Sequence, residues 1–204
     1  MNYKTDQENF WATEFGNDYI NRNEGEKLIS SNLALFSKVL KNCPTVSSIA
    51  ELGCNIGLNL IALNRINNEF QLRGYEINSA ASKLARKSNV AEILNTTILD
   101  KLDISKKFEL TFTKGVLIHI NPTELPIVYQ NLYDLSNRYI MVCEYYNPTP
   151  VSINYRGHND RLFKRDFAGE MIQRFNLKLV NYGFNYKHDS YLTNDDSTWF
   201  LMEK

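Results

Sequence analysis

The spacing of apolar and polar residues divides the chain into alternating helices and strands. Apolar positions three and four residues apart predict helices at residues 24–41, 58–65, 79–88, 121–135 and 166–175. Short runs rich in β-branched and aromatic residues predict strands at residues 46–52, 70–78, 93–99, 138–146, 177–186 and 197–204, with one more that begins at residue 108.

This order of elements predicts the fold. Strands that alternate with helices form a parallel sheet with right-handed crossovers, and the last two strands, with no helix between them, favour an antiparallel hairpin. We therefore predict an α/β fold: a Rossmann-like, doubly wound, seven-stranded sheet, mostly parallel, with an antiparallel C-terminal hairpin. Residues 1–204 are expected to form one domain, within which residues 1–41 are a helical lid or cap. Such sheets bind ligands at the carboxyl ends of their strands.

The segment ELGCNIGLNL (51–60) lies at the first of these strand ends, between a predicted strand and a predicted helix. Gly53 and Gly57 are four residues apart, and Asn55 stands where a dinucleotide-binding loop has its second glycine. Asn is the residue other than Gly that best tolerates left-handed backbone conformations, so Asn55 can preserve the turn. An ordinary strand-to-helix turn is the alternative interpretation.

Glu51 indicates which kind of ligand this loop suits. A carboxylate beside the loop would repel the pyrophosphate that an NAD-binding loop holds at a helix N-terminus. It would suit a cofactor with a cationic end, and S-adenosylmethionine carries an ammonium and a sulfonium but no phosphate. The glycine spacing and the charge together favour S-adenosylmethionine over a dinucleotide.

Two more acidic residues lie at the ends of predicted strands. Glu76, in GYEIN, lies about one βαβ unit beyond the glycine loop, where a carboxylate can accept both hydroxyls of a ribose. Asp100, which follows TTIL, could accept a hydrogen bond from an adenine amino group. The alternatives are a solvated strand-end charge for Glu76 and an ordinary turn residue for Asp100.

The composition limits the classes of function. The 23 basic and 23 acidic residues balance, which argues against a dedicated nucleic-acid binder. The N-terminus carries no apolar signal segment, and no apolar run reaches membrane-spanning length. The three cysteines and three histidines lack the spacing of a zinc site. We therefore expect a cytoplasmic protein without a metal or a membrane partner, either a monomer or a homodimer.

The motifs resemble those of a known enzyme family. The series ELGCNIG, GYEIN, TILD and FELTFTKGVLIHI is similar to the motif series of class I S-adenosylmethionine-dependent methyltransferases, over residues 46–145. A finer resemblance, to the methyltransferases associated with pseudaminic acid biosynthesis, rests on FWATEFGNDYINRN, GVLIHINP, EYYNPTPVSINYRGHNDRLFKRDFAGE and STWFLMEK. The name of that subfamily reflects genetic context, so it only implies a substrate. The general family usually has Gly in place of Asn55, and the subfamily shares the Asn.

The resemblance implies cofactor contacts along the whole motif series. It assigns them to Glu51, Gly53, Asn55 and Gly57 at the methionine end, to Glu76 at the ribose, to Leu99 and Asp100 at the adenine, and to Lys114 and Gly115 beside the sulfonium. From the N-terminal stretch, Tyr19, Arg22 and Asn23 could cap the cofactor carboxylate. The alternative for Tyr19 is packing, together with Trp11 and Phe15, of a helix onto the sheet.

Methyl transfer is an in-line displacement, so the enzyme must hold the nucleophile close and aligned. A hydroxyl acceptor also needs a base, whereas a carboxylate or a free amine needs little or none. His119 lies beyond the fourth predicted strand, near the expected transfer site, and is the candidate base. Its alternative is a packed histidine between Ile118 and Ile120.

The segment YRGHNDRLFKRDF (155–167) is dense in polar chemistry. Its residues Tyr155, Arg156 and His158 are further catalytic candidates, and its basic residues suit a negatively charged acceptor such as a phosphate, a sugar nucleotide or a sugar acid. A salt-bridged surface loop is the alternative.

We predict a methyltransferase that acts on a small, anionic, sugar-type molecule: a sugar, a sugar nucleotide or a nonulosonic acid intermediate of surface glycan biosynthesis. A tRNA methyltransferase is an alternative. A DNA substrate is disfavoured, because TKGV stands after the fourth strand, where DNA amino-methyltransferases have an Asn/Asp-Pro-Pro-aromatic motif. An NAD(P)-dependent sugar oxidoreductase would need other glycine spacing and usually a Tyr-x-x-x-Lys pair, which the chain lacks. A non-catalytic cofactor-binding module is the last alternative, because fold alone does not separate it from an enzyme.

Overall fold

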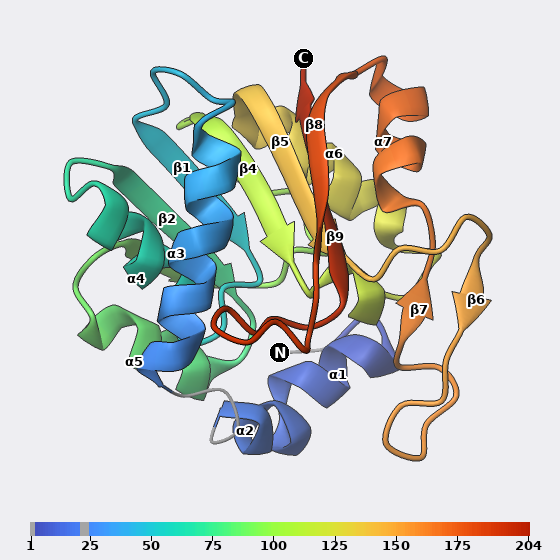
Figure 1. Cartoon of the computed structure of the whole chain (residues 1–204). Helices are drawn as coiled ribbons and strands as arrows, with labels where there is room; N and C mark the ends of the chain where they lie inside the picture. Colours follow the sequence, from blue (N-terminus) through green and yellow to red (C-terminus); the bar gives the residue numbers. More distant parts are fainter. Residues whose placement is uncertain (1–2, 21–24) are drawn as a thin grey trace.

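The computed structural model describes residues 3–20 and 25–204. At its centre is a seven-stranded sheet in the order β3-β2-β1-β4-β5-β9-β8 (Figure 1). Its strands are β1 (Ser48–Leu52), β2 (Gln71–Glu76), β3 (Glu92–Asn95), β4 (Phe108–Lys114), β5 (Ser136–Glu144), β8 (Lys178–Asn185) and β9 (Ser197–Glu203). The first five are parallel, and β9 runs antiparallel between β5 and β8. The predicted fold class is confirmed.

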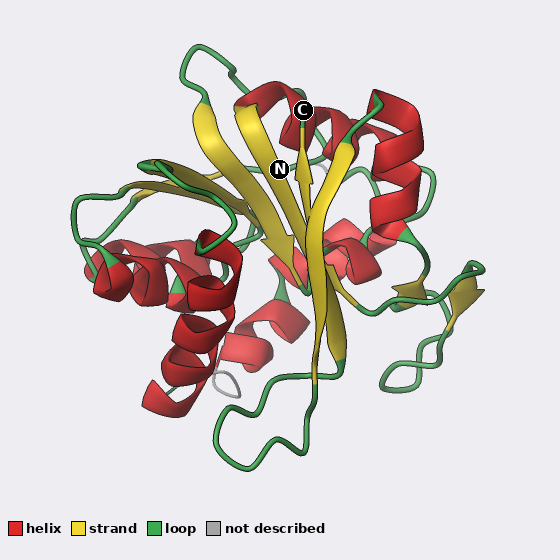
Figure 2. Cartoon of the chain, turned by 45° about the horizontal axis from the view of Figure 1, so that its top comes forward, coloured by secondary structure: helices red, strands yellow, loops and turns green. Residues whose placement is uncertain are grey.

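Helices cover both faces of this sheet (Figures 1 and 2). One face packs against α3 (Glu26–Leu40), α4 (Leu58–Ile66) and α5 (Ser79–Lys87), and the other against α6 (Leu125–Leu135) and α7 (Phe167–Phe175). The alternation is clear in β5, where Ile140 and Val142 belong to one core while Tyr139 and Met141 belong to the other. Burial on both faces explains the continuous apolar run of this strand, which is typical of parallel sheets.

Two element boundaries differ from the predicted ones by more than two residues. The polar residues after β4 do not start a helix at Asn121: its Oδ1 accepts the backbone N–H of Thr123 at 3.1 Å, forming a local turn. α6 begins only at Leu125, with Pro126 in its first turn. Likewise β3 ends at Asn95 instead of continuing to residue 99, because β2, the strand with which it pairs, ends at Glu76, opposite Asn95.

The first two helices lie apart from these layers. α1 (Asp6–Ala12) and α2 (Glu14–Ile20), called here the N-terminal cap, lie across the carboxyl edge of the sheet (Figure 1). Asn78, which follows β2, anchors the cap: its Nδ2 donates to the carbonyl of Trp11 at 3.2 Å and to Oδ1 of Asn17 at 3.0 Å. A short hairpin, β6 (Val151–Ser152) and β7 (Phe163–Lys164), lies beside the cap.

Two further features are absent from the described residues. No helix within residues 3–20 and 25–204 is long and apolar enough to span a membrane. In the same part of the chain, no group of three or more His, Cys, Asp or Glu residues is arranged to hold a metal ion.

Candidate active site

A cavity of about 490 Å³ lies at the carboxyl ends of the central strands. Small-molecule sites typically measure about 300–1,000 Å³, so the volume suits a cofactor or a metabolite. The N-terminal cap and the loop between β8 and β9 form its outer walls. Of the residues predicted from sequence, those that line it are Tyr19, Gly53, Asn55, Glu76, Leu99, Lys114, Gly115 and His119.

The glycine loop turns sharply between β1 and α4. Gly53 and Asn55 have φ angles of +82° and +48°, and Gly57, with φ of +84°, immediately precedes α4. A Cβ at position 53 would lie 2.6 Å from Cγ2 of Val116, so only glycine fits there without displacing its neighbour. Asn55 adopts the left-handed conformation, and the turn therefore forms without a second glycine.

Glu51 is fully buried beneath this loop and does not itself line the cavity. Its Oε1 accepts a 2.6 Å hydrogen bond from Nδ2 of Asn59, in the first turn of α4. Burial raises the pKa of the Glu51 carboxyl to about 8, although the Asn59 hydrogen bond and the Lys114 ammonium lower it. A cation bound nearby would favour the ionised form of this carboxyl.

Three buried oxygens at this end of the cavity lack a donor. Oε2 of Glu51, Oδ1 of Asn59 and Oδ1 of Asn32 accept no hydrogen bond from any residue that the structure describes. Asn32, from α3, lines the cavity together with Asn59. An unpartnered buried polar atom costs about 1–3 kcal/mol, so these atoms indicate a missing donor.

Glu76 ends β2 and is fixed by backbone donors. Its Oε2 accepts the N–H of Asn55 and its Oε1 the N–H of Asn78, both at 2.7 Å. Burial raises the pKa of Glu76, although these N–H groups lower it. A carboxylate has about four acceptor positions, so two remain for a ligand in the cavity.

Lys114 and Gly115 form the next part of the wall, at the end of β4. The Lys114 ammonium forms no ion pair or hydrogen bond within the described part of the chain. Behind them, Glu144 accepts the backbone N–H groups of Val116 and Leu117, both at 3.1 Å, and so fixes the loop after β4. Burial raises the pKa of Glu144 to about 7, against the effect of these N–H groups.

Glu144 was not identified from the sequence. A detectable signal existed, because it is one more acidic residue at the end of an apolar strand, after MVC. Asn59 was missed as well, although an Asn inside the apolar run IGLNLIAL is a comparable signal.

His119 ends a short 3-10 helix, η1 (Leu117–His119), and lines the cavity. Its Nδ1 lies 2.7 Å from the carbonyl oxygen of Arg161, and a carbonyl only accepts, so Nδ1 carries the proton and Nε2 keeps a lone pair. The ring packs between Trp11 and Tyr155, with centroid distances of 4.5 and 5.3 Å. Burial lowers the pKa of His119 to about 4. The side chain is thus both packed and part of the cavity wall.

The loop between β8 and β9 brings a carboxylate to this end of the cavity. Asp195 lines the cavity, and its negative charge partly opposes the effect of burial on the pKa of His119. Burial raises the pKa of Tyr145, and Asp195 raises it further, so all three groups lie close together. Asp195 could not be identified from sequence, because it lies in the polar stretch NDDS, which is typical of any surface turn.

The N-terminal candidates have different positions. Tyr19 lines the cavity, and its ring meets that of Trp11 edge to face at 5.1 Å. Trp11 also lines the cavity, and its Nε1–H has no acceptor among the described residues. Packing and cavity lining are therefore compatible for these aromatic rings. Arg22 and Asn23 lie outside the described residues.

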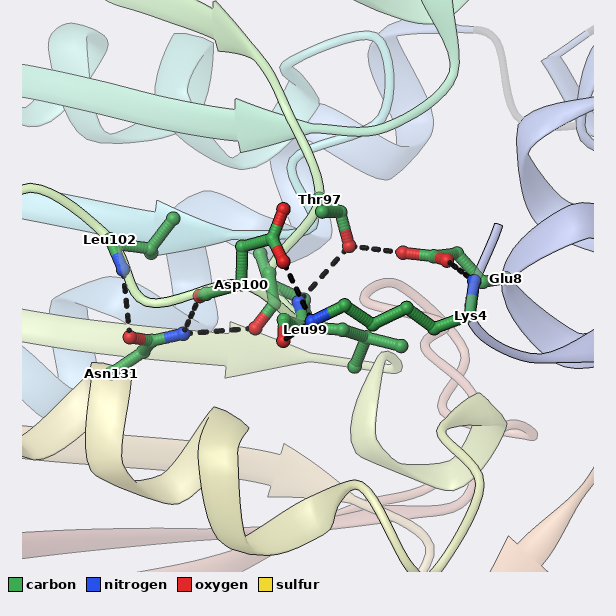
Figure 3. A network of polar contacts seen from close by, with 8 residues as sticks. Lys4, Glu8, Thr97, Leu99, Asp100, Leu102 and Asn131 are labelled. Atoms are coloured by element: carbon green, nitrogen blue, oxygen red, sulfur yellow. Dashed lines mark hydrogen bonds and ion pairs between the residues drawn. The ribbon is translucent and has the colours of Figure 1, made fainter. Parts of the chain in front are cut away.

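Asp100 does not line the cavity, in contrast to the expectation that it borders the adenine. Its Oδ1 pairs with Nζ of Lys4 at 2.6 Å, and its side chain is 57% exposed (Figure 3). Asn131 of α6 fixes this loop from behind, since its Nδ2 donates to the carbonyls of Ile98 and Asp100 at 2.9 and 2.7 Å.

Tyr155, Arg156 and His158 lie on a tight turn outside the cavity wall. Tyr155 and His158 exchange backbone hydrogen bonds of 2.7 and 3.0 Å, and the two residues between them, Arg156 and Gly157, have φ of +50° and +86°. Only Tyr155 approaches the site, through its contact with His119. These positions do not support direct contact of Arg156 or His158 with a reacting group.

Two further basic residues of the segment 155–167 form ion pairs. Arg161 pairs with Asp160 at 2.5 Å, and Arg165 pairs with Glu170 at 2.6 Å. This arrangement matches the alternative of a salt-bridged surface loop for these residues.

No protein-family model matches this chain. No curated protein matches it. Solved structures do match, among them the magnesium protoporphyrin IX methyltransferase ChlM from Synechocystis PCC 6803 with bound S-adenosylhomocysteine (SAH). Its TM-score is 0.70 at 13% identity, and the match covers 98% of this chain and 100% of that one.

Two further structures give similar matches. The plantazolicin methyltransferase BpumL, in complex with SAH, has a TM-score of 0.66 at 14% identity over 97% of this chain and 94% of its own. The glycopeptide N-methyltransferase MtfA, complexed with S-adenosylmethionine, has a TM-score of 0.64 at 8% identity. This match covers 84% of this chain and 93% of that one. At such low identities the likeness establishes the fold: this chain folds as these methyltransferases do.

Proposed function

We propose that this chain is an S-adenosylmethionine-dependent methyltransferase that acts on a small molecule. One observation carries the proposal: the buried oxygens of Asn32 and Asn59 lack donors, and the Glu51 carboxyl lies behind them. The ammonium at the methionine end of the cofactor is a multiple donor with a positive charge, so it fits this set of acceptors. A pyrophosphate would instead need donors at this point.

The fold neighbours support the same cofactor. ChlM and BpumL were crystallised with SAH and MtfA with S-adenosylmethionine. In this chain the carboxyl ends of β4, β1, β2 and β3 form one continuous wall of the cavity. An extended cofactor along this wall would place its ribose at Glu76, whose two remaining acceptor positions suit two hydroxyls.

When bound, S-adenosylmethionine supplies an activated methyl group. The residues of this chain hold the two reactants in line, which is a large part of the rate enhancement in such a displacement. Lys114 and Gly115 form the wall where the methyl group would face the acceptor.

His119 is the proposed base for a hydroxyl acceptor. Its Nε2 lone pair is available, since the Nδ1–H is donated to the Arg161 carbonyl. The pKa of about 4 keeps the ring neutral at pH 7. When the acceptor oxygen forms its bond to the methyl carbon, the bond from that carbon to the cofactor sulfur would break and SAH would leave. His119 Nε2 would take the hydroxyl proton, and the Asp195 carboxylate would stabilise the resulting imidazolium. A positioned base contributes about 10²- to 10⁴-fold.

The proposed acceptor is anionic and of the sugar type: a sugar, a sugar nucleotide or a nonulosonic acid intermediate. Its motivation is the resemblance to the methyltransferases associated with pseudaminic acid biosynthesis, together with two donors in the cavity wall. These donors are the Lys114 ammonium and the Nε1–H of Trp11. These two donors, and not the basic segment 155–167, would contact the acceptor, because that segment lies outside the cavity.

Calorimetry with SAH and with NAD⁺ tests the cofactor. We expect SAH to bind and NAD⁺ not to bind, and the absence of SAH binding at millimolar concentration would overturn the proposal. Incubation of S-adenosylmethionine with a panel of sugar nucleotides and sugar acids, read by mass spectrometry, tests the acceptor. Mass gain of one methyl group on any member supports the acceptor class. Binding without turnover on any acceptor would favour a non-catalytic module.

A further inference from the structure

Glu8, which belongs to none of the motifs, closes the end of the cavity that lies beyond Glu76. β3 is the edge strand next to β2, so the loop after β3 lies beyond Glu76 along the cavity wall. Thr97 and Leu99 of this loop line the cavity, and Glu8 of α1 lies opposite them. If the proposed cofactor extends from the glycine loop past Glu76, its adenine ends between these residues.

The Glu8 carboxylate is held in place by two donors (Figure 3). Its Oε2 accepts the backbone N–H of Lys4 at 2.6 Å, and its Oε1 makes a short hydrogen bond with the hydroxyl of Thr97. The Thr97 oxygen itself accepts the N–H of Leu99 at 3.0 Å, so its hydrogen is directed at Glu8. Glu8 is 9% exposed and lines the cavity. With about four acceptor positions, the carboxylate keeps two for a ligand.

Asp100, the carboxylate expected at the adenine, is engaged elsewhere. Lys4 binds it from the solvent side and also donates from Nζ to the carbonyl of Leu99 at 2.8 Å. Asn131 holds the backbone on both sides of Asp100 through the carbonyls of Ile98 and Asp100 and the N–H of Leu102. The side chain therefore faces Lys4 and does not line the cavity.

Helix capping explains only part of the Glu8 arrangement. Thr5 accepts the N–H of Glu8 at 3.1 Å, which is one half of a capping box at the start of α1. In the other half, a Glu returns to the N–H of the capping residue, but here Oε2 bonds Lys4 instead. A cap also gives no reason for Oε1 to bond Thr97, which is 89 residues away across the cavity wall.

Resting on the proposed function, we propose that Glu8 is the acceptor for the 6-amino group of the cofactor adenine. The N-terminal cap thus supplies the specificity residue that the loop after β3 would be expected to supply. Since α1 then contacts both the cofactor and, through Trp11, the outer end of the cavity, the cofactor can bind fully only while the cap is closed.

The test compares SAH with S-inosylhomocysteine, in which a carbonyl replaces the amino group. We expect the wild-type protein to bind SAH about tenfold or more tightly, because the carbonyl oxygen would face a buried carboxylate. In Glu8→Gln, the amide can donate to that carbonyl, so the preference should disappear or invert. Asp100→Asn is the matched control, and it should keep the wild-type preference.

Two other results would contradict the proposed role of Glu8. If Glu8→Gln weakens both ligands by the same factor, Glu8 only anchors the cap; if Asp100→Asn abolishes the preference, Asp100 is the adenine contact. Should Glu8→Gln fail to fold, Glu8→Asp withdraws the carboxylate by one methylene and should reduce the preference. Failure of the wild-type protein to bind SAH at all would instead overturn the proposed function.

Discussion

The two ends of the cavity differ in the polar atoms that lack partners. At the inner end, beside the glycine loop, these atoms are the acceptor oxygens of Asn32 and Asn59, and the Glu51 carboxyl lies behind them. At the outer end it is a donor, the Nε1–H of Trp11. The inner end therefore complements a group that donates hydrogen bonds, and the outer end complements a group that accepts one.

The two ends also differ in how the chain builds them. Most of the inner end comes from residues 51–59 and 76–78, within one βαβ unit. The outer end combines the N-terminal cap, η1, and the loop between β8 and β9. We therefore expect substitutions at the inner end to change cofactor affinity, and substitutions of η1 at the outer end to change turnover at constant cofactor affinity.

The largest effect is expected from Gly53→Ala. Backbone strain of about 1–3 kcal/mol adds to overpacking of about 1–3 kcal/mol, because the new Cβ would lie 2.6 Å from Val116. The free variant can relieve this cost by shifting the loop, and SAH binding must then restore the native turn. SAH affinity should therefore fall by about 1,000-fold, since 1.4 kcal/mol corresponds to a factor of ten. Gly157→Ala is the control: its φ is +86°, but no atom lies within 4 Å of the new Cβ. Calorimetry should find its SAH affinity unchanged, with melting curves to check folding.

The corresponding substitution at the outer end is His119→Asn. Loss of the base should lower turnover by about 100-fold or more, while SAH affinity stays within about twofold of wild type by calorimetry, since His119 is placed at the acceptor end. Unchanged turnover would show that His119 only packs between Trp11 and Tyr155. A large loss of SAH affinity would show that the two ends are not separate.

Glu51→Gln should have a moderate effect at the inner end. A hydrogen bond to a charged group contributes about 1.5–3 kcal/mol, so SAH affinity should fall between about 10- and 100-fold. The amide keeps the shape of the side chain, and melting curves would show whether the fold is retained. Wild-type affinity in this variant would exclude the charge as a part of cofactor recognition.

The smallest effect is expected from Arg156→Asn, on the turn outside the cavity. Asn tolerates the φ of +50° at this position. The Arg156 guanidinium lies 6.0 Å from the centroid of the Phe15 ring, and an exposed contact of this kind contributes about 0.5–1 kcal/mol. The KM for the acceptor should therefore rise by less than about fivefold. A larger rise in steady-state kinetics would mean that this turn reaches the acceptor.

Some of this arrangement was predictable from sequence because its causes are local. Short runs rich in β-branched and aromatic residues mark the strands of the sheet, so their number and approximate positions could be predicted. The turn at Gly53 and Asn55 could be predicted as well, since the φ angles it needs restrict the residue types directly. Glu76 was found because a carboxylate that follows a strand is visible in one short segment.

The remainder depends on residues that are far apart in the sequence. Nothing near Asp100 indicates that Lys4 binds it, and nothing near Glu8 indicates its bond to Thr97. The position of Asp100 after a strand favoured its interpretation as an adenine contact. In the structure its carboxylate instead pairs with Lys4. Asp195 likewise reaches His119 only through the course of the loop between β8 and β9.

The central claim is that the inner end binds a cation against the buried Glu51 carboxyl, and proton linkage tests it most directly. Burial holds the pKa of Glu51 at about 8, so at pH 7 the free protein carries this carboxyl mostly protonated. A bound ammonium favours the ionised form and lowers this pKa, so binding should release a proton. The ionised fraction also grows as pH rises toward 8, and affinity should rise with it.

The measurement is calorimetry of SAH binding between pH 6 and 8, in two buffers of different ionisation enthalpy. We predict affinity that increases with pH, an observed enthalpy that depends on the buffer through release of a fraction of a proton, and the loss of both in Glu51→Gln. SAH binding that is independent of pH and buffer in the wild-type protein would contradict the claim.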